Sequence, residues 1–121
     1  TVLPGCALFL NLPLSPVRDM INAGLPVAMA SDFNPGTAPS GNMQLVMSLA
    51  CIRYKMTPEE AFNATTINTA AAMDVNRELG SITKGKLANV IITMPMNGLE
   101  FMPYYFGANK VSKVIVKGKM R

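Results

Sequence analysis

Asp32 is the residue of this sequence best placed to do chemistry. It comes just after Leu25–Ala30, a continuous apolar run that is typical of a parallel strand covered on both faces. Ligands bind at the edge of an α/β sheet where its parallel strands end, both in open sheets and in barrels. We therefore expect the Asp32 carboxylate to lie at that edge, within reach of a ligand.

The loop that contains Asp32 has two interpretations. Asp32 and Asn34 lie in a stretch dense in Pro, Gly and small polar residues, where their side chains commonly serve the turn itself as Asx turns. Alternatively, the Asn34 amide is a donor and an acceptor aimed at a substrate, while Gly36 and Thr37 offer backbone N–H groups and a hydroxyl to an anion. Spacing alone leaves both interpretations open and favours the turn.

A complete hydrolytic or zinc site is not expected within these 121 residues, because the sequence contains no histidine. Histidine is the commonest general base and metal ligand. Cys6 and Cys51 lie inside apolar runs and are expected to be reduced core thiols of a cytosolic protein. Such a site must therefore take residues from elsewhere, and because the chain begins at Thr1 we expect it to be a piece of a longer protein.

The charge distribution gives no indication of nucleic-acid or membrane binding. The net charge is +4, and the basic residues concentrate near the C-terminus, at Lys110, Lys113, Lys117, Lys119 and Arg121. We interpret them as a solvated strand face, because nucleic-acid sites combine a denser basic patch with stacking aromatic residues. The apolar runs are well short of the roughly 20 residues that a membrane span needs.

The elements expected to position Asp32 alternate between helix and strand. Ser15 is a good N-cap for a helix that has Pro16 in its first position and ends at Gly24, directly before strand 25–30. Helix followed by parallel strand is one step of an α/β fold. If this chain holds only part of the sheet, an apolar strand edge is expected to be left unpaired.

Two more helices are expected after the loop. The first is amphipathic, with apolar residues at helical spacing. The second begins with a capping box, in which Thr57 caps the helix and the Glu60 side chain closes the box, and it runs to about Met73. The apolar positions of the first helix are Leu45, Leu49, Ile52 and Met56.

The character of the sequence changes after residue 76. Residues 88–94 and Val111–Val116 are rich in β-branched side chains and predict two strands. We therefore assign residues 1–76 to an α/β domain and residues 77–121 to a small β appendage.

Several motifs resemble one family. The segment Ser31–Thr37, directly after the apolar run, closely resembles the last barrel strand and loop of the imidazolonepropionases, metal-dependent amidohydrolases of histidine degradation. The resemblance covers essentially this whole chain but only about the last third of such an enzyme. Asn89 departs from it, because the superfamily usually has aspartate there. The other matching segments are Leu3–Leu10, Asn42–Ala50, Thr57–Ala61, Thr66–Ala71, Gly80–Ile82, Gly85–Ile92 and Pro103–Gly107.

The resemblance implies a fold and a reaction. Residues 1–76 would be the last strands and helices of a (β/α)₈ barrel, and residues 77–121 the C-terminal segment of a small β-sandwich domain. The reaction would be metal-assisted hydrolysis of 4-imidazolone-5-propanoate to N-formimidoyl-L-glutamate, using one divalent metal, zinc or iron. The full-length enzyme would be a cytoplasmic homodimer acting on this small molecule.

The resemblance also implies roles for the loop residues. Asp32 would ligate the metal and help handle the proton of the attacking water. Asn34, Gly36 and Thr37 would hold the substrate, including its carboxylate end. The other ligands would be histidines on earlier strands, so the chain alone is expected to be inactive.

Two alternatives stand beside this interpretation. The first is another amidohydrolase-superfamily enzyme, such as a different cyclic-amide hydrolase or a deaminase, in which Asp32 has the same role on another substrate. The second is a noncatalytic α/β binding or assembly module, in which residues 32–37 are only a turn.

Overall fold

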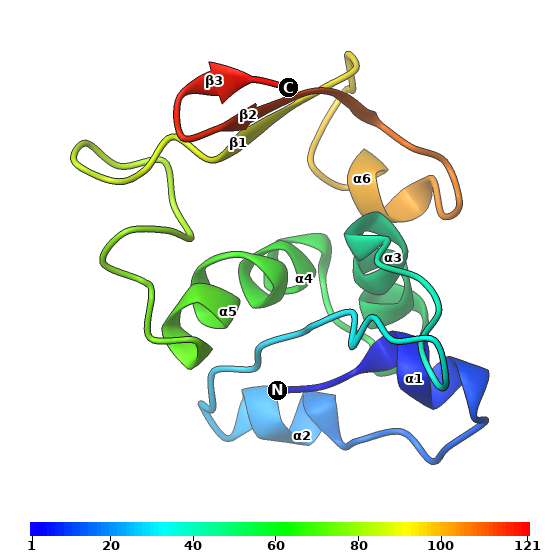
Figure 1. Ribbon diagram of the computed structural model, residues 1–121. Helices are drawn as coiled ribbons and strands as arrows, with labels where there is room; N and C mark the ends of the chain where they lie inside the picture. The colour runs from blue at the N-terminus through cyan, green and yellow to red at the C-terminus, as the bar shows by residue number, and fades with distance from the viewer.

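Helices make up most of the first part of the chain and a small sheet lies at the other end (Figure 1). The computed structural model describes all residues from Thr1 to Arg121. The sheet lies apart from α1–α5, whereas α6 packs on α3. None of the helices is both long enough and apolar enough to cross a membrane. In chain order the elements are α1 (Pro4–Phe9), α2 (Val17–Asn22), α3 (Met43–Tyr54), α4 (Pro58–Thr65), α5 (Ile67–Ala72), β1 (Val90–Thr93), α6 (Phe101–Tyr104), β2 (Val111–Val116) and β3 (Lys119–Met120).

In the segment before Asp32, Val27, Ala28 and Met29 are buried, and only Met29 has a ladder partner. Met29 forms an isolated parallel bridge with Val2, in which Val2 N donates to Ala28 O at 2.8 Å and Ala30 N donates to Val2 O at 3.1 Å. The prediction of a parallel direction is therefore correct, but a continuous strand over 25–30 is not present. Met29 is fully buried at the centre of the core.

The helix before this segment is one residue shorter at its start than the sequence predicts. Pro16 is the N-cap of α2 and no side chain caps it, so the prediction of a Ser15 cap is wrong. The Ser15 carbonyl instead accepts from Val17 N at 2.8 Å. The helix ends as predicted, because Gly24 has φ +78°, a left-handed conformation that glycine adopts without steric cost.

Helix α3 is covered on more than one side, which the predicted amphipathic pattern misses. It packs against α1, α4 and α6. Ile52, expected to face the core, is 53% exposed, whereas Ser48 is fully buried and donates to Pro103 O of α6 at 2.7 Å. The helix starts firmly, because Asn42 Oδ1 accepts from Gln44 N at 3.0 Å and from Leu45 N at 3.1 Å.

The capping box at Thr57 is confirmed, but the helix that it opens is broken. Thr57 Oγ1 accepts from Glu60 N at 3.3 Å, and Glu60 Oε2 accepts from Thr57 N at 2.8 Å. The predicted single helix to Met73 is wrong, because the chain leaves helical geometry at Thr66, with φ −126° and ψ −87°. The Thr66 hydroxyl donates back to Phe62 O at 2.7 Å, a competing bond that commonly bends helices.

The C-terminal sheet is antiparallel in the order β1-β2-β3. Both predicted strands are present, with Val90 paired to Ile115 and a register shift after Ile92. β2 and β3 are joined by a tight turn in which Lys117 and Gly118 have φ 51° and 76°, as a type I′ turn requires. Asn89 Oδ1 accepts from Lys117 N at 2.8 Å, a role that aspartate could also fill.

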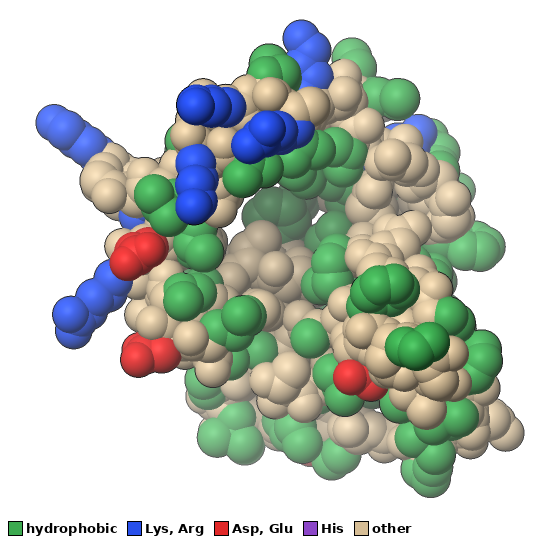
Figure 2. Space-filling model, viewed as in Figure 1, with side chains coloured by type: hydrophobic (Ala, Val, Ile, Leu, Met, Phe, Trp, Pro, Cys, Tyr) green, Lys and Arg blue, Asp and Glu red, His purple; other side chains and the backbone are tan.

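A hollow separates the sheet from the helices (Figure 2). It has a volume of about 470 Å³ and lies between α4–α5 and β1. Lys113, Lys117 and Lys119 are exposed, and Lys and Arg side chains gather on the sheet side of the molecule, as the solvated strand face predicts.

One ion pair joins α2 to the start of α4. Arg18 Nη1 donates to Glu60 Oε1 at 3.0 Å, and Arg18 Nη2 reaches Lys55 O at 2.6 Å. The hydrogen bond from Arg18 lowers the pKa of the Glu60 carboxyl, and the backbone N–H of Thr57 contributes in the same direction.

We therefore predict that Glu60→Gln lowers stability at neutral pH and that the deficit shrinks in acid. A carboxyl whose pKa is lower in the folded state stabilises the fold above its unfolded pKa of about 4.3, and loses that contribution as the pH falls through the folded pKa. Urea unfolding of the product of the complete reading frame, followed at pH 7 and in steps below pH 4, measures the difference. The matched control is Glu59→Gln, an exposed residue of the same helical turn. Equal deficits for the two variants at every pH would contradict this role of Glu60.

Candidate functional site

The Asp32 carboxylate is exposed and has no hydrogen-bond partner. Its backbone adopts a left-handed conformation, with φ 52°, which aspartate tolerates better than most residues. Its side chain is therefore aimed by the backbone alone, since nothing else holds it. A carboxylate in this state has all of its lone pairs available to a ligand.

Asn34 organises the loop around Asp32. Its Nδ2 donates to Asp32 O at 2.6 Å, and its Oδ1 accepts from Gly36 N at 2.9 Å and from Thr37 N at 2.8 Å. Asn34 N also donates to Ala38 O at 3.0 Å, which closes the loop. Of the two interpretations that spacing left open, this geometry is that of the Asx turn.

Gly36 and Thr37 face inward on this turn. Their N–H groups, expected to meet an anion, are both directed at Asn34 Oδ1, and the Thr37 hydroxyl lies 3.2 Å from the same atom. The structure thus places Asp32, Asn34, Gly36 and Thr37 in one loop, but only Asp32 presents an unoccupied polar group. The other three fix the loop's shape, and a ligand would have to exchange their hydrogen bonds.

The chain contains no complete metal site. No three His, Cys, Asp or Glu side chains lie close enough together to hold an ion. The free carboxylate of Asp32 has the oxygen donors that a divalent metal accepts, so it fits as a single ligand. Any further ligands of such a metal would have to come from outside these residues.

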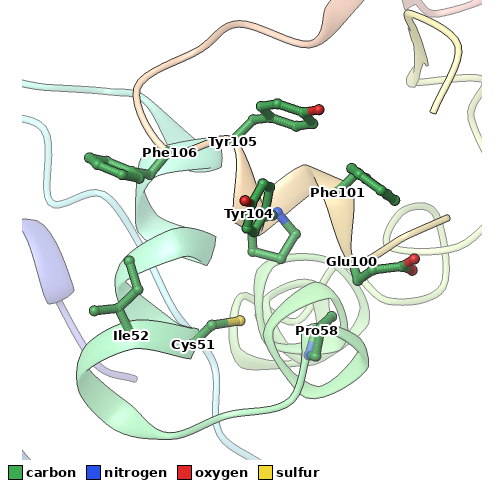
Figure 3. A pocket seen from close by; sticks show the side chains of 9 residues that line it. Cys51, Ile52, Pro58, Glu100, Phe101, Tyr104, Tyr105 and Phe106 are labelled. Carbon is green, nitrogen blue, oxygen red and sulfur yellow. The ribbon is translucent and has the colours of Figure 1, made fainter. Parts of the chain in front are cut away.

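A wide cavity lies away from Asp32. It has a volume of about 1090 Å³ and is lined by α3, Pro58 and the segment around α6 (Figure 3). Phe101, Tyr104 and Tyr105 form much of its wall, with ring centroids 5.3–6.2 Å apart. Burial raises the pKa of the Cys51 thiol at its edge, so this thiol is not an activated nucleophile. The cavity is mostly apolar, and Glu100 contributes the one carboxylate of its lining.

Two residues that support the site were not singled out from the sequence. Asn68 and Thr69 hydrogen-bond to the carbonyls of Val27 and Met29, just before Asp32. The motif Thr66–Ala71 contains them, but nothing in the spacing of that motif says what its polar side chains contact.

Residues 11–121 match the profile of the amidohydrolase family, and the chain belongs to that family. It is similar to the imidazolonepropionase of Christiangramia forsetii, with 57% identity over 118 residues that make up 98% of this chain and 29% of that protein. It is also similar to the imidazolonepropionase of Parabacteroides distasonis, with 48% identity over 120 residues, 99% of this chain and 29% of that protein. The expected resemblance is confirmed, and the chain spans about 29% of the length of these curated relatives.

Solved structures show the same fold at lower identity. An adenosine deaminase from Xanthomonas campestris with bound zinc superimposes with a TM-score of 0.86 at 22% identity, over 98% of this chain and 30% of that chain. The guanine deaminase of E. coli gives a TM-score of 0.80 at 18% identity, over 99% of this chain and 33% of that chain. The arrangement of helices and sheet is therefore that of amidohydrolase-family proteins.

We predict that Asn34→Ala releases the Gly36 and Thr37 amides to solvent exchange, because both lose their acceptor. Asn34→Asp keeps an oxygen at that position and should retain most of their protection. Amide hydrogen exchange of both variants, read at these two residues, measures the effect. Unchanged protection in Asn34→Ala would show that the Asx turn does not hold the loop in solution.

Proposed function

We propose that this chain is the C-terminal part of an imidazolonepropionase, which hydrolyses 4-imidazolone-5-propanoate to N-formimidoyl-L-glutamate. The observation that carries the proposal is the free Asp32 carboxylate at the end of a buried parallel segment, in a chain 57% identical to a curated imidazolonepropionase. The low-identity deaminase structures support the fold alone.

The division of the chain follows from the same proposal. Residues 1–76 would be the closing strands and helices of the (β/α)₈ barrel, which the parallel bridge between Val2 and Met29 and the flanking helices support. Residues 77–121 would belong to the small β-sandwich domain, which the separate antiparallel sheet supports (Figure 1). A whole barrel takes about 250 residues, far more than this part of the chain holds.

Asp32 would be one ligand of a divalent metal, zinc or iron. When bound, such an ion lowers the pKa of a water molecule and polarises a carbonyl. An Asp32 Oδ atom would accept the proton of the attacking water and pass it to the ring nitrogen as the C–N bond of the cyclic amide breaks. The free lone pairs of Asp32 and its exposure to solvent support this role.

Asn34, Gly36 and Thr37 would hold the substrate. The substrate carries a carboxylate, and two N–H groups with a neighbouring hydroxyl suit such an anion. These groups are satisfied by the Asn34 side chain without substrate. Binding would therefore exchange hydrogen bonds within the loop, and the same loop that orients Asp32 would respond to the substrate.

The remaining features of the proposal concern the complete protein. It would be a cytoplasmic homodimer whose partner is the small-molecule substrate, with no role for nucleic acid or membrane. The similarity to imidazolonepropionases over nearly the whole chain supports the small-molecule substrate.

We predict that Asp32→Asn in the product of the complete reading frame lowers kcat for imidazolonepropionate by at least about 100-fold, the usual range for loss of a general base. Asparagine keeps the shape and tolerates the left-handed backbone but cannot take the proton. The matched control is Asp74→Asn, another exposed aspartate with φ 56°. Assays against other cyclic amides and aminopurines, run in parallel, separate this activity from that of a related hydrolase or deaminase. Full activity of Asp32→Asn would refute the proposal.

The chain of 121 residues, prepared alone, is predicted to show no imidazolone hydrolysis and to bind zinc no more tightly than about micromolar, because it supplies one ligand where catalytic zinc sites have three. Isothermal titration with zinc and a turnover assay test this. Tight stoichiometric zinc binding with turnover would show that the metal site lies within the chain.

A further inference from the structure

The break between α4 and α5 frees a carbonyl that binds the segment leading to Asp32. In an unbroken helix Ala64 O would accept from the amide four residues later. Here it accepts from Met29 N at 2.8 Å instead. The edge of the segment that faces away from Val2, expected to be unpaired, is thus hydrogen-bonded at Met29.

Two side chains from the same break bind the neighbouring carbonyls. Asn68 Nδ2 donates to Val27 O at 2.8 Å. Thr69 Oγ1 lies 3.0 Å from Met29 O and 2.6 Å from Ala64 O, so its hydroxyl joins the segment to the helix end. We call the Ala64 carbonyl, the Asn68 amide and the Thr69 hydroxyl the strand clamp.

The strand clamp acts on a buried part of the chain three residues before Asp32. Met29 is fully buried and Val27 is 6% exposed, so their backbone groups have no water to replace a lost partner. The Asp32 side chain has no partner, so its position depends on how its backbone is held, by Asn34 on the loop side and by the strand clamp on the segment before it. A shift of the segment along its axis would displace the backbone that carries the Asp32 carboxylate.

We propose that Asn68 and Thr69 are positioning residues for Asp32, which set the place of its carboxylate relative to the metal. The proposal rests on the proposed function, since it takes Asp32 to be a ligand. Loss of residues that hydrogen-bond to and orient a metal ligand commonly lowers metal affinity by about 10- to 100-fold.

The test uses the product of the complete reading frame and zinc alone as the probe. Thr69→Val keeps the shape and removes the hydroxyl, and we expect the zinc dissociation constant, measured by chelator competition, to rise about tenfold. Thr69→Ser restores the hydroxyl and is expected to restore the affinity. Amide exchange at Met29 should be faster in Thr69→Val than in the parent.

The matched control is Thr65→Val, one turn earlier. Its hydroxyl bonds only to the helix carbonyls of Ala61 and Phe62, at 3.0 and 3.1 Å, so zinc affinity should not change. Equal losses in Thr65→Val and Thr69→Val would overturn the proposal, because they would reflect general loosening of the helices. Unchanged zinc affinity in Thr69→Val would also overturn it. If Thr69→Val does not fold, Asn68→Ala decides by the same measurement.

Asp32→Asn separates this inference from the proposed function. If Asp32→Asn binds zinc like the parent, Asp32 is not a ligand and both fail. If Asp32→Asn loses zinc while Thr69→Val and Asn68→Ala keep it, Asp32 is a ligand and only the strand clamp's role fails.

Discussion

The structure depends on how one short buried segment is hydrogen-bonded from both sides. Val2 binds Ala28 and Ala30 on one edge, and the break between α4 and α5 binds Met29 on the other. Unpaired backbone groups in a dry core are costly, so the segment has little freedom to slide. The helix break, which looks like a defect of α4, is what makes the second edge possible. The placement of Asp32 follows from these bonds.

In the loop after this segment, one residue holds the backbone and another presents a free carboxylate. Asn34 takes up the amides of Gly36 and Thr37 and the carbonyl of Asp32, so the backbone is held without using the Asp32 side chain. The Asp32 carboxylate has no partner, and the Asp32 backbone has a left-handed conformation that few residues adopt. A carboxylate whose backbone is fixed and whose oxygens have no partner is already in position for a ligand, and no hydrogen bond to it has to be broken first.

Features of the fold that depend on neighbouring residues could be predicted from the sequence, whereas those that depend on packing between distant elements could not. The capping box at Thr57, the glycine stop at Gly24 and the two β-branched strands depend on neighbouring residues alone, and all are present. The burial of Ser48 depends on α6, a distant element that the pattern of α3 does not show. The strand clamp joins residues about 40 positions apart, so spacing could not reveal it.

In the proposed enzyme, Asp32 would deliver a carboxylate oxygen to a metal whose other ligands lie outside this chain. The most direct test is a crystal structure of the complete protein with anomalous scattering at the zinc edge. We expect a peak about 2.0–2.2 Å from an Asp32 Oδ atom. A metal bound elsewhere, with the Asp32 carboxylate folded back onto the amides of its own loop, would contradict it.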